Sequence, residues 1–242
     1  MTRTFAMTRR VLQQLSHDPR SIVLILAMPS VLLLVFRYVY DSQPQIFDRI
    51  GPQMIGLFPF VIMFLVTSVT MVRERTSGTL ERLLTTPLAR GELIGGYALA
   101  FAVAALAQAA LTTAFALGVL NLDIALPWAL LAFAVLGAVV GTALGLLASA
   151  FARTEFQAVQ FMPLVIVPQI LLCGLLIARD QMPDVLYGLS WSLPLSYATD
   201  AFTELATSDA FSSDLLVDLL ALVGFALAAI LGASLTLRRR SA

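Results

Sequence analysis

The chain has 242 residues, of which 59% are hydrophobic and only 12% are charged, and its formal net charge is zero. A soluble domain carries about 25% charged residues, so this composition excludes a soluble globular protein. All fifteen basic residues are Arg, and without a Lys the chain has no P-loop for binding nucleotide phosphates. Its one Cys excludes an intrachain disulfide, and its one His excludes a metal site built on histidines.

The N-terminal segment, residues 1–20, is predicted to form a short amphipathic helix in the cytoplasmic interface of a membrane. Val11, Leu12 and Leu15 recur at helical spacing, and polar residues occupy the other faces. A proline then disfavours helical backbone in the residue before it and ends the helix. The residues assigned to this interfacial helix and its terminating turn are Arg9, Arg10, Asp18, Pro19 and Arg20.

Six hydrophobic segments along the chain are long enough to cross a bilayer. Runs of about 20 apolar residues indicate membrane-spanning helices, and the alternation of polar and apolar positions typical of barrel strands is absent. The predicted spans are Ser21–Tyr40, Pro52–Val72, Leu93–Leu120, Pro127–Phe151, Val159–Ala178 and Leu215–Leu237. The sequence therefore predicts an all-α integral membrane protein in which residues 1–242 form a single transmembrane domain.

The distribution of Arg predicts how these spans are oriented. Twelve of the fifteen Arg fall on the cytoplasmic side if both termini lie there, and only Arg37, Arg49 and Arg179 fall outside. Because basic loops favour the cytoplasmic side, we expect both termini to be cytoplasmic. Residues 180–214 then form an external segment, which is rich in aromatic and apolar residues and is expected to fold into short helices in the outer leaflet.

A charged segment, residues 73–92, separates the second and third spans. Gly78 interrupts the preceding structure and Pro87 ends helical backbone again, which leaves Thr79–Thr86 as a short helix. A helix this short is marginal on its own in water, so it must dock on something. The residues alone leave a partner protein and the lipid surface as equal alternatives. Its apolar face is formed by Leu80, Leu83 and Leu84.

The motifs of this segment resemble, in order and spacing, those of ABC export permeases of the type-2 superfamily. The short daunorubicin-resistance and nodulation-type permeases are the most similar in kind. The motifs are Arg73-Glu74-Arg75, Gly78-Thr79-Leu80-Glu81, Leu83-Leu84, Thr86-Pro87 and Gly95-Gly96. "HDPR" at 17–20 and "MPDVLYGLSWSLPLSYATDAF" at 182–202 resemble the same family. A base often follows Asp200 by three positions in that family, but this chain has Thr203 there.

The resemblance implies that residues 73–92 contain a coupling helix, which docks on a separate ATP-binding subunit. The implied partners are two such subunits, which would bind ATP and Mg, and a second permease, identical or related. Membrane lipid is the other expected partner, in a bacterial inner membrane. This chain would be a non-catalytic permease with no cofactor, metal or nucleic-acid partner of its own. The coupling residues so assigned are Arg73, Glu74, Arg75, Gly78, Thr79, Leu80, Glu81, Leu83, Leu84 and Pro87.

The same resemblance implies that spans two and five line the transport route where two permeases meet. An uncharged, aromatic-lined route suits an amphipathic drug, a lipid or a secondary metabolite. Export of a glycan or glycolipid, transport driven by an ion gradient and a scaffold without transport activity are the alternatives. The residues assigned to the route are Phe60, Phe64, Phe161 and Gln169, for which packing or a lipid-facing position is an equal alternative.

Small and polar residues inside the spans predict contacts between helices. Gly137, Gly141 and Gly145 recur at four-residue spacing, and we favour packing within the chain over a dimer interface for them. Gln108 is expected to make an interhelical hydrogen bond. Besides Arg37 and Asp218 near span ends, the predicted span interiors lack ionisable residues. This counts against a proton-coupled transporter, which normally places acids or His at that depth.

Overall fold

A computed structural model describes residues 2–78 and 90–236 and contains helices and no strand in those ranges. Six of the helices are long and apolar enough to cross a membrane, which confirms the predicted fold class. The elements are α1 (Thr2–Ser16), α2 (Pro19–Val39), α3 (Pro44–Thr76), α5 (Arg90–Gly118), α6 (Pro127–Ser149), α7 (Glu155–Leu172), the 3-10 turn η1 (Arg179–Gln181), α8 (Asp184–Ser190), α9 (Pro194–Leu205) and α10 (Ser213–Thr236).

Each predicted span coincides with one of the long helices, but the second and fifth have different limits. Helix α3 begins at Pro44 rather than Pro52, since a proline fits the first turn of a helix, where its missing N–H costs nothing. Helix α7 ends at Leu172 rather than Ala178, because Gly174 adopts a left-handed φ of +96° that stops helical backbone.

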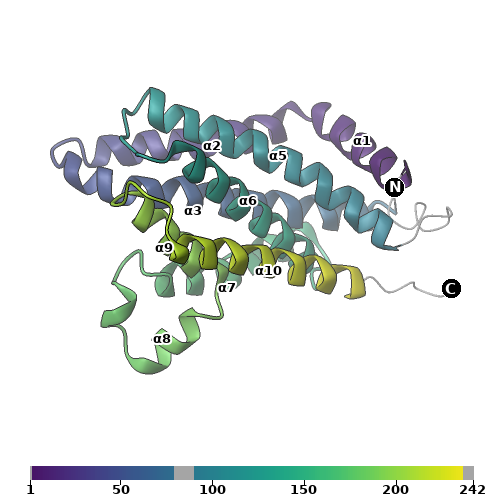
Figure 1. Cartoon of the computed structure of the whole chain (residues 1–242). Helices are drawn as coiled ribbons and strands as arrows, with labels where there is room; N and C mark the ends of the chain where they lie inside the picture. Colours follow the sequence, from purple (N-terminus) through teal and green to yellow (C-terminus); the bar gives the residue numbers. More distant parts are fainter. Residues whose placement is uncertain (1, 79–89, 237–242) are drawn as a thin grey trace.

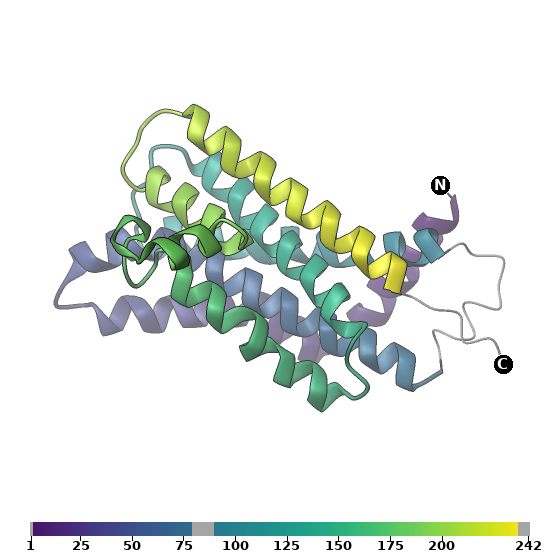
Figure 2. The same ribbon diagram turned by 90° about the horizontal axis from the view of Figure 1, so that it is seen from below.

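The long helices form one bundle with α3 near its centre (Figure 1). Helix α1 lies at the end of the bundle where α3 and α10 finish and α5 begins, which we call the α1 end. The elements η1, α8 and α9 lie toward the opposite end, which we call the α9 end, and the view from below in Figure 2 shows the same separation. Which end faces the cytoplasm remains a prediction.

Close packing of α6 on α3 forms the middle of the bundle. A Cβ atom at Gly141 would lie 2.2 Å from the carbonyl oxygen of Phe60, and one at Gly145 would lie 2.6 Å from that of Phe64. Only glycine permits backbones to approach so closely. The predicted role of these glycines in packing within the chain is therefore confirmed.

Polar side chains between the spans are joined to neighbouring helices. The Gln108 Nε2 atom of α5 donates a hydrogen bond of 2.7 Å to the carbonyl oxygen of Ile25 in α2, as predicted. The Gln53 Nε2 atom of α3 donates a bond of 2.6 Å to the Thr203 hydroxyl in α9. Such bonds fix the relative position of helices where lipid offers no competing partner.

Candidate functional site

The predicted interfacial helix α1 forms and packs its apolar side on α5. Met7 and Val11 are 3% and 4% exposed. A Cβ atom at Gly96 would lie 2.6 Å from Met7 Cβ, whereas one at Gly95 would meet only Thr4 Cγ2 at 3.5 Å, an ordinary contact. Gly96 therefore determines how closely α1 can approach α5.

Glu74, in the last turn of α3, is buried at 3% exposure and is bound by α1. The Gln14 Nε2 atom donates a short hydrogen bond to Glu74 Oε1, and Arg10 Nη2 lies 3.9 Å from Glu74 Oε2. A buried carboxylate needs such partners, because its desolvation is costly. Glu74 thus connects the end of α3 to the N-terminal helix.

A cavity of about 60 Å³ lies beside this contact and is lined by Gln14, Glu74, Tyr97 and neighbouring side chains. Among the described residues, Glu74 Oε2 and the Tyr97 hydroxyl have no hydrogen-bond partner. The volume exceeds the roughly 15 Å³ that one water needs. Glu74, Tyr97 and Arg10 lie close enough to interact electrostatically, so they form a polar joint between α3, α5 and α1.

The two residues that flank Glu74 bind other helices. Arg73 forms two hydrogen bonds of 3.1 Å with the Glu155 carboxylate at the start of α7. Arg75 Nη1 donates a bond of 2.8 Å to the carbonyl oxygen of Ser149, the last residue of α6. The three consecutive residues at the end of α3 therefore contact α7, α1 and α6, respectively.

Helix α3 ends where the sequence predicted a break. Gly78 has a left-handed φ of +71°, and its N–H donates to the carbonyl oxygen of Arg75 at 3.2 Å. This geometry closes a helix and is favourable for glycine. The remaining assigned coupling residues lie outside the described residues, so their helix stays a prediction: Thr79, Leu80, Glu81, Leu83, Leu84 and Pro87.

The turn between α1 and α2 agrees with the predicted stop. Helix α1 ends at Ser16 and α2 begins at Pro19, and the carbonyl oxygen of Asp18 accepts the Ile22 N–H at 3.1 Å. Arg10 faces Glu74, whereas Arg9 is exposed. The side chain of Arg20 is outside the part of the chain that the structure describes.

The residues assigned to the transport route lie in three different surroundings. Phe60 and Phe64 are 1% and 0% exposed in the core beside α6. Phe161 is half-buried against the small cluster that includes Val72. Gln169 is buried, and its Oε1 atom accepts the Leu195 N–H of α9 at 3.4 Å. Their role in lining a route stays a prediction.

A buried cation at the α9 end was not singled out from the sequence. Arg179 is 8% exposed, and its Nε atom donates a bond of 3.0 Å to the Ser190 hydroxyl. Its Nη1 atom forms a short ion pair with Asp200, and its Cζ atom lies 4.2 Å from the centre of the Trp191 ring. The available signal was a single Arg directly before the aromatic-rich segment 180–214.

Asp200 thus pairs with a cation that lies 21 positions earlier in the chain. Burial raises the pKa of Asp200, and the nearby Arg179 guanidinium lowers it to a smaller extent. Asp218, the acid expected near the start of the last span, is also buried, at 8% exposure in α10.

Comparison with known proteins agrees with this architecture. Residues 2–206 match the ABC-2 type transporter family. Two relatives, each named "Probable multidrug ABC transporter permease YbhR", come from Escherichia coli strain K12 and Escherichia coli O157:H7. Each is 30% identical over 178 residues, which cover 73% of this chain and 48% of the relative. The chain thus spans about half the length of the curated relatives it matches.

The family match includes α1, the end of α3 with its three helix contacts, and the α9 end with Arg179 and Asp200. Together with six helices suited to crossing a membrane, it identifies a multi-pass membrane protein that belongs to the ABC-2 type transporter family.

Proposed function

We propose that this chain is the membrane-spanning permease subunit of an ATP-driven exporter and that a separate subunit hydrolyses the ATP. The observation that carries the proposal is the family match across most of the chain. The absence of any Lys supports a separate nucleotide-binding subunit, because a P-loop needs one. The proposed cargo is an amphipathic drug, a lipid or a secondary metabolite, in line with the relatives' name as probable multidrug permeases.

The complete exporter in this proposal contains two permeases, identical or related, and two ATP-binding subunits that hold ATP and Mg. It lies in a bacterial inner membrane with both termini of this chain in the cytoplasm. The α1 end then faces the ATP-binding subunits, and residues 73–92 dock on them. The charges of this segment would give the contact its register and specificity.

The joint at the end of α3 suggests how closure of the ATP-binding subunits would reach the spans. A push on residues 73–92 arrives first at Arg73, Glu74 and Arg75. These residues bind α7, α1 and α6, so one displacement would act on three helices. Charge-assisted hydrogen bonds also have a defined geometry, so they would fix the register between the end of α3 and these helices.

Gentle purification of the chain from its native membrane, followed by mass analysis of bound proteins, tests the assembly. We expect a stoichiometric soluble subunit that carries a P-loop. Replacement Leu84→Arg should release this subunit, because it places a charge on the proposed docking face. If the ATP-binding subunit stays bound to the Leu84→Arg variant and export continues, Leu84 does not dock it.

Substitutions at two neighbouring glycines of α5 can distinguish binding of the ATP-binding subunit from transmission of its movement through α1. Gly96→Ala forces Met7 and α1 away, whereas Gly95→Ala makes only an ordinary contact. We expect Gly96→Ala to retain the ATP-binding subunit and to lower export by about tenfold, the equivalent of ~1.4 kcal/mol of strain. Gly95→Ala should export at the wild-type rate, and equal activity of both variants would exclude a role for the position of α1.

Two further measurements distinguish the alternative functions. Stimulation of ATP hydrolysis by amphipathic compounds, but not by glycolipids, in a reconstituted complex supports the proposed cargo. Transport by this chain alone under an imposed proton or sodium gradient would instead identify a secondary transporter. Failure to find any bound ATP-binding subunit, even after cross-linking at residue 84, would favour that outcome or a scaffold.

A further inference from the structure

An open groove runs along the outer side of α1, away from its contact with Glu74. It has a volume of about 440 Å³ and is lined, among the described residues, by six side chains of this helix alone. They are Phe5, Thr8, Arg9, Leu12, Gln13 and Ser16. The groove thus combines two large apolar side chains with a cation, an amide and hydroxyls.

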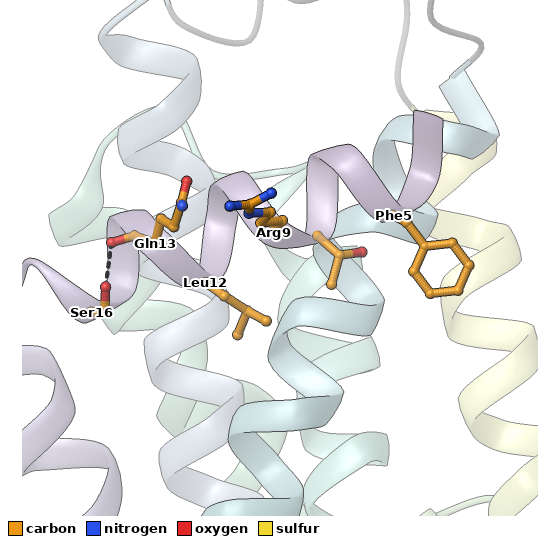
Figure 3. A pocket seen from close by; sticks show the side chains of 6 residues that line it. Phe5, Arg9, Leu12, Gln13 and Ser16 are labelled. Carbon is orange, nitrogen blue, oxygen red and sulfur yellow. Dashed lines mark hydrogen bonds between the residues drawn. The ribbon is translucent and has the colours of Figure 1, made fainter. Parts of the chain in front are cut away.

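The apolar side chains of the groove point to one side of α1, and its polar side chains lie along the helix (Figure 3). The side chains of Phe5 and Leu12 point from α1 toward the part of the view occupied by the spans, and Arg9 and Gln13 lie along the helix itself. Phe5 is 66% exposed although it is large and apolar. A phospholipid at a membrane interface presents this same order, with acyl chains on one side and a phosphate above them.

The groove's hydroxyls are already engaged, but its other donors are available. Thr8 Oγ1 donates to the carbonyl oxygens of Thr4 and Gly96, and Ser16 Oγ donates to that of Gln13 at 2.7 Å. The side chains of Arg9 and Gln13 make no hydrogen bond or ion pair with the rest of the described chain. Two donor groups therefore remain for a ligand with oxygen acceptors.

The charge of α1 favours an anionic ligand over a zwitterionic one. Helix Thr2–Ser16 contains three Arg and no acid. Arg10 is directed to Glu74, so Arg9 is the cation that faces the groove. An Arg at a membrane surface attracts anionic lipid by ~1 kcal/mol, which corresponds to about fivefold in affinity.

We infer that the outer groove of α1 binds one anionic phospholipid. Arg9 and the Gln13 amide hold the phosphate, and Phe5 and Leu12 contact the first part of an acyl chain. The inference rests on the position of α1 beside the spans and is independent of any transported cargo.

Native mass spectrometry of the full chain in detergent tests this site with two probes of identical acyl chains, phosphatidylglycerol and phosphatidylcholine. We expect the wild-type chain to bind phosphatidylglycerol about fivefold more tightly. Arg9→Gln should remove this preference, and Phe5→Ala should weaken both lipids by a similar factor. Arg49→Gln is the matched control, since Arg49 is an exposed Arg in the first part of α3, whereas α1 lies at the end of the bundle where α3 finishes.

Four results would overturn the inference. The first is a wild-type chain without preference for the anionic lipid, and the second is an Arg9→Gln variant that keeps the preference while eluting as a folded protein. The third is competition by inorganic phosphate at millimolar concentration, which would indicate a site for a free anion. If Arg9→Gln instead weakens only the attachment of an ATP-binding subunit, the groove recognises protein rather than lipid.

Discussion

A buried acid at the α1 end and a buried cation at the α9 end are held by partners at different distances along the chain. Glu74 binds Gln14, which lies 60 positions away in a separate helix. Arg179 binds Ser190 and Asp200, which lie only 11 and 21 positions further along the chain, in α8 and α9. Both side chains are at least nine-tenths buried, with exposures of 3% and 8%.

The difference indicates that the two contacts have different purposes. The contacts of Arg179 shape one segment, so they stabilise the local arrangement of α8 and α9. The contacts of Glu74 connect α3 with α1, two helices that lie far apart in the chain, so they respond when α1 moves relative to α3. A polar contact between distant parts of the chain at a helix end is therefore the better candidate for transmitting a movement. A local contact is the better candidate for keeping the α9 end rigid.

The largest effect is expected for loss of the buried cation. Arg179→Met removes the ion pair with Asp200, the hydrogen bond to Ser190 and the contact with the Trp191 ring. We expect the free energy of unfolding in detergent to fall by about 3 kcal/mol, chiefly because the buried guanidinium loses its ring contact and its hydrogen bond to Ser190. The pair with Asp200 adds less, since the Asp200 side chain is 41% exposed. Chemical denaturation monitored by tryptophan fluorescence measures this, because Trp191 is one of only two tryptophans.

Arg49→Met is the control for this experiment. Arg49 is exposed and lies in the first part of α3, so its replacement should change stability by less than about 0.5 kcal/mol. Equal destabilisation by the two variants would mean that Arg179 contributes no more than a surface residue.

A smaller effect is expected at the α1 end, where it should depend on Glu74. Gln14→Leu leaves a buried carboxylate without its hydrogen-bond donor, at a cost of about 2 kcal/mol. In a Glu74→Leu background the same replacement should be nearly neutral, since no charge remains to be satisfied. A double-mutant cycle on unfolding free energies measures this coupling, and additive effects would contradict a direct contact.

Most of the fold could be predicted because membrane spans are long apolar runs. The failures occurred where helix limits depend on other signals. The first turns of α3 contain Asp48 and Arg49, so their composition resembled a loop although Pro44 could begin a helix. The end of α7 depends on the backbone angle of Gly174, which apolar composition does not reveal.

The candidate site was predictable as a segment but not as a set of contacts. The motif Arg73-Glu74-Arg75 was found from its charges, yet nothing in the sequence indicates that three consecutive residues bind three different helices. The pairing of Arg179 with Asp200 was missed for a similar reason. Partner choice depends on how helices pack in space, and spacing along the chain does not determine it.

The exposed pair next to Glu74 should contribute little to stability. Arg73 and Glu155 have side chains that are 56% and 43% exposed, and exposed ion pairs contribute about 0.2–1 kcal/mol. Arg73→Gln should therefore lower the unfolding free energy by about 0.5 kcal/mol at most, and salt at about 1 M should remove the difference from the wild type. A loss of unfolding free energy above about 2 kcal/mol would mean that the Arg73–Glu155 pair stabilises the fold as strongly as a buried ion pair does.

The smallest effect is expected from pH at the α9 end, because burial and Arg179 act on the pKa of Asp200 in opposite directions. Since burial has the larger influence, the pKa of Asp200 is higher in the folded than in the unfolded chain. The folded state then binds more protons between the two pKa values, so this group lowers stability as pH rises through that interval and has a constant effect above it.

Comparison of wild type with Asp200→Asn by thermal unfolding from pH 7 to pH 4 isolates this contribution. The stability difference, wild type minus variant, should shift in favour of the wild type as pH falls. A shift in favour of the variant would mean that the Arg179 ion pair dominates, and the α9 end would then be held by charge rather than by burial.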